Sequence, residues 1–372
     1  MPFELDPDLI HLNHAAVAPW PRCTREAVEA FARENARHGS RHYPRWLEVE
    51  KELRARLARL IGAVDTDIAL LKSTSEAFSV VAHGLRWHAG DRVVISNEEF
   101  PSNRIVWESL ADQGVDVIEV DLHRGNTPED ALIEACDEHT RLLSISSVQY
   151  ASGLRVDLER LGRFCREHGI LFCVDAIQSL GALRLDVTAA HIDFLMADGH
   201  KWLLGPEGLA LFYSHPDARE RLRLHQFGWH MVETIDFDRR DWQIARSARR
   251  FECGSPNMLG IHALHASVGL LLDTGMETVE RAVLERARHL FRRIAASDRL
   301  ECLTDTHPDR HAGIVLFRHR QVPAERLYAW LMEHQVLCAR RGPGVRFSPH
   351  FHTPLAQLDR AVTLAEACPA ET

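Results

Sequence analysis

Short apolar runs alternate with longer amphipathic segments up to about residue 260. An apolar run of this length is typical of a buried strand, and apolar residues three or four positions apart are typical of a helix. The apolar runs cover residues 68–71, 92–95, 115–120, 142–145, 170–174, 192–196 and 209–213. The amphipathic segments cover residues 24–60, 77–87, 103–113, 128–138 and 158–168. This alternation predicts an α/β fold, with a mostly parallel seven-stranded sheet and helices on both faces.

The pattern changes in the last third of the chain. A helical stretch at residues 261–295 is followed by a strand at 313–318, a helix at 324–334 and a strand at 336–339. These elements predict a smaller C-terminal α+β domain. We therefore expect an N-terminal segment (residues 1–20) that contributes to the small domain and the site, a large cofactor-binding domain (21–257) and the small domain (258–372).

Composition narrows the class of protein. The chain has 372 residues, of which 45% are hydrophobic and 26% charged, as is ordinary for a globular protein. A formal net charge of -9 argues against a nucleic-acid partner. No run approaches the roughly 18 apolar residues of a membrane span, and the N-terminus lacks the apolar centre of a signal peptide. The eight cysteines form no CxxC pair, so we expect reduced thiols and a cytoplasmic protein.

A lysine and an aspartate follow two of the apolar runs. Lys201 lies in the sequence DGHKW just after residues 192–196, and Asp175 directly follows residues 170–174. Because the carboxyl ends of parallel strands meet at one edge of a sheet, we expect the two side chains to lie close together. A lysine amine can form an imine with an aldehyde, and a carboxylate can keep a pyridine nitrogen protonated. The pair therefore predicts an enzyme that uses pyridoxal phosphate (PLP).

Three further features fall in predicted loops, and each has two interpretations. Ser73 to Glu76 join a strand to a helix, where their hydroxyl and N–H groups could cradle a phosphate or cap the helix. Phe100 could stack on a flat cofactor or plug the core. Arg346 could bind a substrate carboxylate or lie on the surface.

Two histidines have the spacing of metal ligands. His262 and His265 are three residues apart in a predicted helix. The sequence indicates no carboxylate or cysteine to complete such a site, so we expect no metal.

The sequence resembles the class V aminotransferase-fold PLP enzymes, which have the fold-type I architecture. This group includes cysteine desulfurases, selenocysteine lyases, kynureninases and isopenicillin N epimerase-like proteins. The resemblance runs from LNHAA at residues 12–16 to RFSPH at residues 346–350. It is most specific at VDAIQS (174–179), at GHKWLLGP (199–206) and at RFECGSPN (250–257), which is similar to the RFExGTPN segment of the family.

The resemblance implies how the cofactor is held. Lys201 is implied as the catalytic lysine that holds PLP. The other implied cofactor contacts are Asp175 at the pyridine nitrogen, Gln178 at the phenolic oxygen, Phe100 stacked on the ring, and Thr74, Ser75, Glu76 and His200 at the phosphate. Either Gln149 or Tyr150 is expected to face the cofactor.

The resemblance also implies a substrate and a partner. Arg346 is implied as the clamp for the carboxylate of a small amino acid, with Asn13 and His14 as further substrate-binding residues. Ser255 is implied to reach the phosphate of the neighbouring subunit's PLP. This contact implies a homodimer with shared active sites.

Three positions depart from the desulfurase pattern. Phe100 stands where desulfurases have a histidine that transfers protons, and Gly199 stands where many members have a serine or threonine. Desulfurases carry a nucleophilic cysteine roughly fifteen residues before the clamp arginine. Here the nearest is Cys338, eight residues before Arg346, in a predicted strand where a cysteine is usually inert.

We expect a PLP-dependent enzyme that acts on a small amino acid through an external aldimine and a Cα carbanion. An aminotransferase or a lyase is the main hypothesis. The alternatives are a cysteine desulfurase or selenocysteine lyase that uses Cys338, and an isopenicillin N epimerase-like enzyme. A PLP-binding protein without turnover is a further possibility of a different class. The sequence does not choose the fate of the carbanion.

Overall fold

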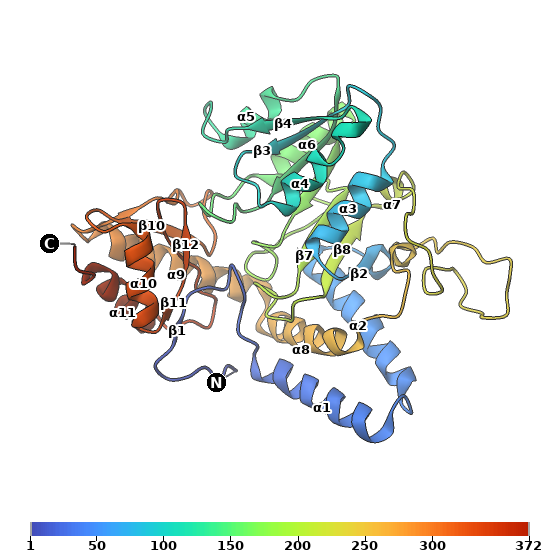
Figure 1. Ribbon diagram of the computed structural model, residues 1–372, viewed down its shortest axis with the longest axis horizontal. Coiled ribbons are helices and arrows are strands. Elements are labelled where there is room, and N and C mark those ends of the chain that lie inside the picture. Colours follow the sequence, from blue (N-terminus) through green and yellow to red (C-terminus); the bar gives the residue numbers. More distant parts are fainter. Residues whose placement is uncertain (1, 371–372) are drawn as a thin grey trace.

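The computed structural model describes residues 2–370, and its largest sheet runs through the upper right of Figure 1. The strands in order across this sheet are β2 (Ile68–Leu71), β8 (Ala210–Ser214), β7 (Phe194–Asp198), β6 (Leu171–Asp175), β5 (Thr140–Ser146), β3 (Arg92–Ser96) and β4 (Asp116–Val120). β8 is antiparallel to both of its neighbours, and the other adjacent pairs are parallel. The predicted seven-stranded, mostly parallel sheet is confirmed.

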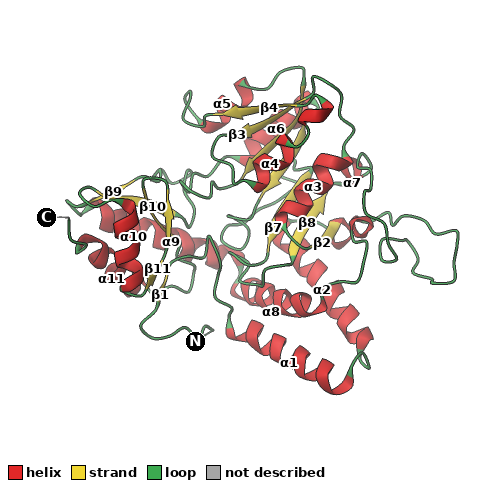
Figure 2. Cartoon of the chain, viewed as in Figure 1, coloured by secondary structure: helices red, strands yellow, loops and turns green. Residues whose placement is uncertain are grey.

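Helices cover both faces of this sheet (Figure 2). The helices of this part of the chain are α1 (Arg22–His38), α2 (Tyr43–Ile61), α3 (Thr74–Gly84), α4 (Ser102–Glu108), α5 (Pro128–Glu134), α6 (Leu158–His168), α7 (Pro216–Arg219) and α8 (Met258–Thr274). Consecutive residues of β3 point to opposite faces, so Val94 joins the core beneath α2, α6 and α8. Val93 and Ile95 join the core beneath α3 and α4.

A second, smaller group of strands and helices lies at the left of Figure 1. Its antiparallel sheet has the order β12 (Ala339–Arg341), β13 (Gly344–Phe347), β10 (Val315–His319) and β9 (Leu300–Cys302). The helices that accompany it are α9 (Met276–Ala295), α10 (Ala324–Glu333) and α11 (Leu355–Glu366). Near the N-terminus, β1 (Ile10–His11) pairs with β11 (Val336–Leu337). The exact domain limits stay a prediction, because α8 packs on α1 and α2 of the large sheet's layer.

Two predicted helical stretches are broken in the structure. Residues 24–60 form two helices, because the chain turns at Gly39, whose φ is +55°. Residues 261–295 belong to α8 and α9, which separate at Gly275 with φ +82°. Both angles are in the left-handed region that glycine adopts without strain. The second of the two helices in residues 24–60 ends at Gly62, whose φ is +69°.

Several short strands were not predicted at all. β1, β9 and β13 have two to four residues each, which is too short for a periodic pattern. No helix within residues 2–370 is long and apolar enough to cross a membrane.

Candidate active site

A cavity of about 350 Å³ lies at the carboxyl ends of β3, β5, β6 and β7. Ligands of open α/β sheets bind in this position. The β12–β13 hairpin and the N-terminal ends of α3 and α4 complete its walls. The lining residues are Ala15, Ala16, Ser73, Thr74, Ser75, Phe100, Ser102, Tyr150, Asp175, Ile177, Gln178, Asp198, His200, Lys201, Arg341 and Arg346.

The structure places Lys201 and Asp175 together in this cavity. The two residues are 8% and 2% exposed. Asp175 ends β6, where its Oδ1 accepts the N–H of Ile177 at 2.9 Å. Burial lowers the pKa of Lys201 to about 8, against the stabilising charge of Asp175. Lys201 is therefore closer to its neutral, nucleophilic form than a lysine in water.

Burial also raises the pKa of Asp175. A protonated pyridine nitrogen beside this carboxylate would lower that pKa again, because an opposite charge favours the ionised form. A cationic ring beside Asp175 would therefore favour the ionised carboxylate, which burial alone disfavours.

Hydroxyl groups gather at the N-terminal end of α3. Ser73 caps the helix, and its Oγ accepts the N–H of Glu76 at 3.2 Å, so the expected cap is confirmed. Thr74 and Ser75 line the cavity, and the Oγ1 of Thr74 is buried without a hydrogen-bond partner. The Oγ of Ser75 lies 2.8 Å from the Oγ of Ser102. This end of the cavity is built for an anion with several oxygens.

Glu76 is the exception among the predicted phosphate contacts. Its carboxylate accepts the N–H of Lys72 at 2.7 Å, and its own N–H is bonded to Ser73. Glu76 borders a separate hollow of about 820 Å³ and does not line the Lys201 cavity. The geometry gives it a role in shaping the start of α3.

Aromatic and amide groups form the wall beside Lys201. Phe100 lies with its ring centroid 5.5 Å from the Nζ of Lys201, and it meets the ring of Tyr150 edge to face at 5.2 Å. Gln178 is held at both ends, since its Nε2 donates to Ala15 O and its Oε1 accepts from the Trp202 indole. One N–H of the Gln178 amide remains for a ligand.

The sequence left open whether Gln149 or Tyr150 faces the cavity. Tyr150 lines it. Gln149 is buried in the core, where its Nε2 donates to Ser96 Oγ at 3.1 Å and to Glu99 at 2.9 Å.

Arg346 is fully buried in β13 and faces the cavity, so the surface interpretation of this arginine is wrong. Its Nη1 donates to Tyr150 O at 2.6 Å, and its Nη2 donates to Asn13 Oδ1 at 3.4 Å. Its Nε has no partner, and none of its contacts within residues 2–370 is a carboxylate. Burial lowers the pKa of Arg346 to about 9. A substrate carboxylate would supply the missing anion.

The N-terminal residues lie behind this wall. Asn13 orients Arg346 and pairs with Ser348 in a short bridge. His14 is fully buried, with its Nδ1 2.9 Å from Ser348 O, and its ring packs on Trp202. Neither residue lines the cavity, and their role in substrate binding stays a prediction.

Ser255 also lies outside the cavity. It is exposed on the loop that precedes α8, between the half-buried Gly254 and Pro256. Its predicted contact with a second subunit's phosphate stays a prediction.

Three lining residues were missed from the sequence. Ser102 follows Pro101 at the start of a short helix, which gave a weak signal of a cap. Asp198 ends β7, and its Oδ1 lies 2.9 Å from the Nδ1 of His200. Arg341 ends β12, a strand that was not predicted over these residues. A carboxylate at a strand end was the signal that found Asp175, and it applied equally to Asp198.

The cysteines lie outside the cavity wall, although Cys338 is close enough to Arg346 for the charge of the guanidinium to act on its thiol. No cysteine lines the cavity. Cys338 lies between β11 and β12 and is 2% exposed, and burial raises the pKa of its thiol to about 12. The predicted strand over residues 336–339 is thus interrupted at Cys338.

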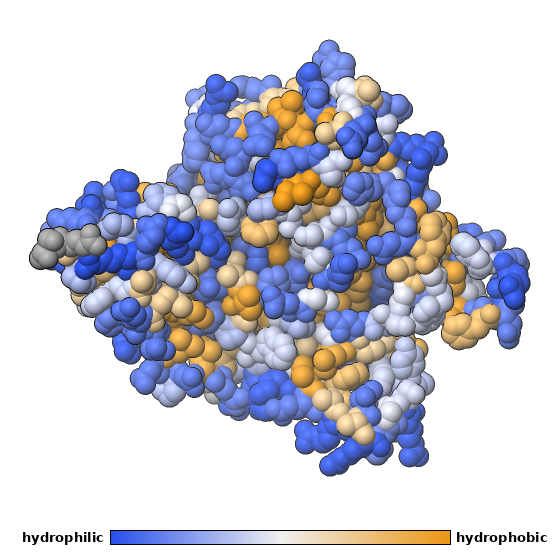
Figure 3. Space-filling model, viewed as in Figure 1, coloured by the Kyte–Doolittle hydropathy of each residue, from blue (hydrophilic) through white to orange (hydrophobic). Residues whose placement is uncertain are grey.

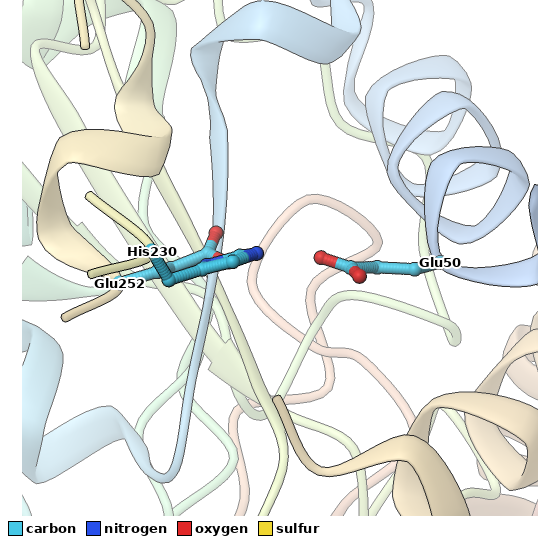
Figure 4. A group of neighbouring side chains, drawn as sticks. All are labelled: Glu50, His230 and Glu252. Carbon is cyan, nitrogen blue, oxygen red and sulfur yellow. The ribbon is translucent and has the colours of Figure 1, made fainter. Parts of the chain in front are cut away.

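Within residues 2–370, one group of side chains has the spacing of metal ligands. Figure 4 shows Glu50 pointing from α2 toward His230 and Glu252, and ligand atoms of the three lie within 4.8 Å of one another. Arg54 forms ion pairs with both carboxylates. Because the Arg54 guanidinium already pairs with both carboxylates, we interpret the group as an ion-pair network.

The two histidines singled out from the sequence are placed apart from this group. His262 Nδ1 lies 2.8 Å from Met258 O within its own helix. His265 Nε2 lies 2.9 Å from Glu52 Oε2, a carboxylate neighbour that the sequence did not indicate.

The cavity residues fit PLP. The cavity is in the size range of small-molecule sites. An amine and a carboxylate are buried together, and an unpaired hydroxyl marks the anion end. PLP needs these groups for its aldehyde, its ring nitrogen and its phosphate.

Comparison with known proteins gives the same assignment. A family model described as aminotransferase class-V matches residues 10–357. A probable cysteine desulfurase of Methanothermobacter thermautotrophicus is 32% identical over 340 residues, which cover 90% of this chain and 84% of that protein. The isopenicillin N epimerase of Streptomyces clavuligerus is 28% identical over 389 residues, which cover 99% and 96%.

Solved structures of other proteins have a fold similar to that of this chain. A complex between the cystine C-S lyase C-DES and its reaction product, cysteine persulfide, matches with a TM-score of 0.91 at 22% identity, over 97% of this chain and 98% of that one. The chain therefore belongs to the class-V aminotransferase family and is a PLP-dependent enzyme of that family. The fold-type I expectation is confirmed. The named relatives favour the desulfurase and epimerase alternatives over the main hypothesis of an aminotransferase or a lyase.

Proposed function

We propose that this enzyme is a lyase that binds PLP through Lys201 and cleaves the Cβ–S bond of a small sulfur-containing amino acid. The observation that carries the proposal is the placement of Arg346 and Lys201 in a cavity that no cysteine lines. The names of the relatives support a sulfur-containing substrate. An elimination needs a base at Cα and an electron sink, and it needs no cysteine nucleophile.

The chain supplies binding, orientation and proton transfer. PLP, when bound, supplies an electron sink for the pair that the Cα–H bond releases. Arg346 binds the substrate carboxylate, and the Nζ of Lys201 removes the proton from Cα. Asp175 would keep the ring nitrogen of bound PLP protonated, and Phe100 would cover the ring. Loss of the β-substituent followed by hydrolysis gives a thiol, pyruvate and ammonia from the amino acid and one water.

A cysteine desulfurase is the second candidate, because desulfurases are among the named relatives. In that reaction a protein thiolate takes the sulfur, and Cys338 is the nearest cysteine in sequence to Arg346. Its burial and raised pKa disfavour a thiolate. An aminotransferase or an epimerase would share the first proton transfer and differ in where the proton returns.

The assay follows the fate of the substrate. Protein reconstituted with PLP is reduced with borohydride, and we expect a pyridoxyl group on the peptide that contains Lys201. An amino-acid panel then separates the reactions by product, which is pyruvate for a lyase, alanine and persulfide for a desulfurase, a keto acid for an aminotransferase and the inverted amino acid for an epimerase. No adduct at Lys201 would refute the cofactor assignment.

The cysteine variants separate the first two candidates. We expect Cys338→Ala to release sulfur at the wild-type rate, like its matched control Cys368→Ala, which changes another buried cysteine of the same layer. Loss of sulfur release in Cys338→Ala alone would favour the desulfurase.

The proposal includes a homodimer with shared sites. Ser255 is exposed and lies outside its own cavity, as a contact to a second subunit requires. The nearby loop carries exposed Phe227, Phe237 and Trp242, and it extends at the right of Figure 1 and Figure 3.

Light scattering tests the homodimer, because it measures the mass of the protein in solution. Mixing Lys201→Ala with Ser255→Ala subunits tests sharing, because one of the two mixed sites has both residues. The cytoplasmic location stays a prediction.

A further inference from the structure

Arg341 is a second cavity arginine without an acidic partner. Its Nη1 donates to the neighbouring Arg340 O at 2.7 Å, and its guanidinium carbon lies 5.8 Å from the ring centroid of Tyr150. Its Nε is buried with no hydrogen-bond partner. No ion pair joins Arg341 to a carboxylate of residues 2–370. Neither the aromatic contact nor the backbone bond neutralises its charge.

The hairpin geometry directs Arg341 and Arg346 to the same place. β12 and β13 are antiparallel, with Arg341 opposite Gly344 and Ala339 opposite Arg346. Because side chains alternate between faces, Arg341 and Arg346 share one face of this ribbon as diagonal neighbours. Arg340 projects from the other face and pairs with Glu325. Both Arg341 and Arg346 line the cavity.

Before a cofactor or substrate binds, the cavity wall carries more cationic than anionic side chains. Three cations, Lys201, Arg341 and Arg346, face two carboxylates, Asp175 and Asp198. Asp198 is in contact with His200 at the phosphate end. The positive charge of Arg341 lowers the pKa of both Lys201 and Arg346, which agrees with its closeness to them. The α-carboxylate of an amino acid would satisfy only one arginine.

We infer that Arg341 binds a second anionic group of the substrate, so that the enzyme selects amino acids whose side chain or leaving group ends in an anion. This inference rests on the proposed function for the position of the α-carboxylate on Arg346. It narrows the substrate class to β-substituted alanines with an anionic substituent. A neutral substituent would leave a buried guanidinium nitrogen of Arg341 unpaired. The enzyme would therefore discriminate strongly between anionic and neutral substrates.

The test uses two substrates that differ only in charge. S-carboxymethylcysteine and S-carbamoylmethylcysteine have the same leaving atom and nearly the same shape. For the wild-type PLP enzyme we expect kcat/KM to be at least about 10-fold higher for the anionic substrate, because only its anionic group forms a charge-assisted hydrogen bond with Arg341. In Arg341→Gln we expect this ratio to fall by about 10-fold. In Arg340→Gln, the matched control, we expect the wild-type ratio.

A binding measurement separates this inference from the proposed reaction. Calorimetric titration with aspartate and with asparagine reads the same charge preference without turnover. If elimination fails but aspartate binds at least about 10-fold more tightly and Arg341→Gln removes that preference, the reaction is wrong and the inference stands. Equal binding of both ligands by the wild type would overturn the inference. The inference would also be overturned if Arg341→Gln binds PLP more weakly and keeps the wild-type ratio of kcat/KM for the two substrates.

Discussion

At the scale of single residues, the cavity combines burial with incomplete hydrogen bonding. Arg346 is fully buried with an unpaired Nε, and Thr74 is 5% exposed with an unpaired Oγ1. Leaving a buried polar group unpaired costs about 1–3 kcal/mol. Such groups are retained where a ligand satisfies them, and these two lie where a carboxylate and a phosphate are proposed.

Thr74→Val tests the phosphate end. The change removes one hydroxyl at nearly constant shape, and we expect PLP to bind about 10-fold more weakly because a hydrogen bond to a charged group is lost. We expect the cofactor-free protein to be at least as stable as the wild type, since an unpaired buried hydroxyl is removed. Absorbance titration with PLP and thermal unfolding measure the two effects.

The matched control is Thr24→Val. Thr24 is also buried with an unpaired Oγ1, but it lies in α1 and does not line the cavity. It should change stability in the same direction and leave PLP affinity unchanged. Wild-type PLP affinity in Thr74→Val would contradict the assignment of the phosphate end.

At the scale of elements, a buried ion-pair network fixes the segment that leads to Ser255. Arg54 of α2 pairs with Glu50 in its own helix and with Glu252, which follows the short helix η3 (Ala248–Phe251). Glu252 also accepts the N–H of Leu70 in β2 at 2.9 Å. The network therefore joins a helix, the antiparallel edge of the sheet and the RFECGSPN segment.

Arg54→Met tests this network. We expect a loss of about 3–5 kcal/mol in the free energy of unfolding, because two buried carboxylates lose their counter-charge. Urea unfolding monitored by tryptophan fluorescence measures it. The control is Arg25→Met, which breaks the exposed Arg25–Glu29 pair of α1 and should leave stability unchanged within error. Equal stability of the two variants would show that Arg54 is not needed to balance these carboxylates.

At the scale of the whole molecule, a cluster of buried histidines lies where three parts of the chain meet. His11 and His14 come from the N-terminal segment, and His350 and His352 follow β13. Their rings pack on one another and on Trp202, which is adjacent to Lys201. Protonation of this cluster would therefore loosen the contact between the small sheet and the cavity.

Burial fixes the sign of the resulting pH dependence. It lowers the pKa of His11 and of His350 to about 4, and it lowers the pKa of His14 well below the ordinary value of 6.5. Between these values the unfolded chain binds more protons than the folded one, so stability falls as pH falls from 6.5 toward 4. Each histidine contributes a slope of up to about 1.4 kcal/mol per pH unit.

The variant His11→Leu tests this contribution. We expect the fall in unfolding free energy across this pH window to be shallower than in the wild type by up to about 1.4 kcal/mol per pH unit. Denaturant midpoints measured at several pH values give the slope. His88→Leu changes a histidine whose side chain is 77% exposed and should keep the wild-type slope. An unchanged slope in His11→Leu would contradict the prediction.

The sequence by itself determined the large sheet and the central pair of the site. The seven apolar runs indicated the number of strands and most of their limits, since every strand of the large sheet except β4 is buried along most of its length. Lys201 and Asp175 could be found because parallel strands bring their carboxyl ends to one edge. Local signals of this kind need no knowledge of distant contacts.

Only the tertiary structure decided which of the other candidate side chains line the cavity. His14 and Glu76 lie in segments that resemble the family but do not line the cavity. Arg341 and Asp198 do line it, from strands whose ends the sequence placed poorly. The pairing of β12 with β13 also depends on contacts that the local sequence does not specify. Short strands are held by partners far away in the sequence, so periodicity over a few residues carries too little information to specify them.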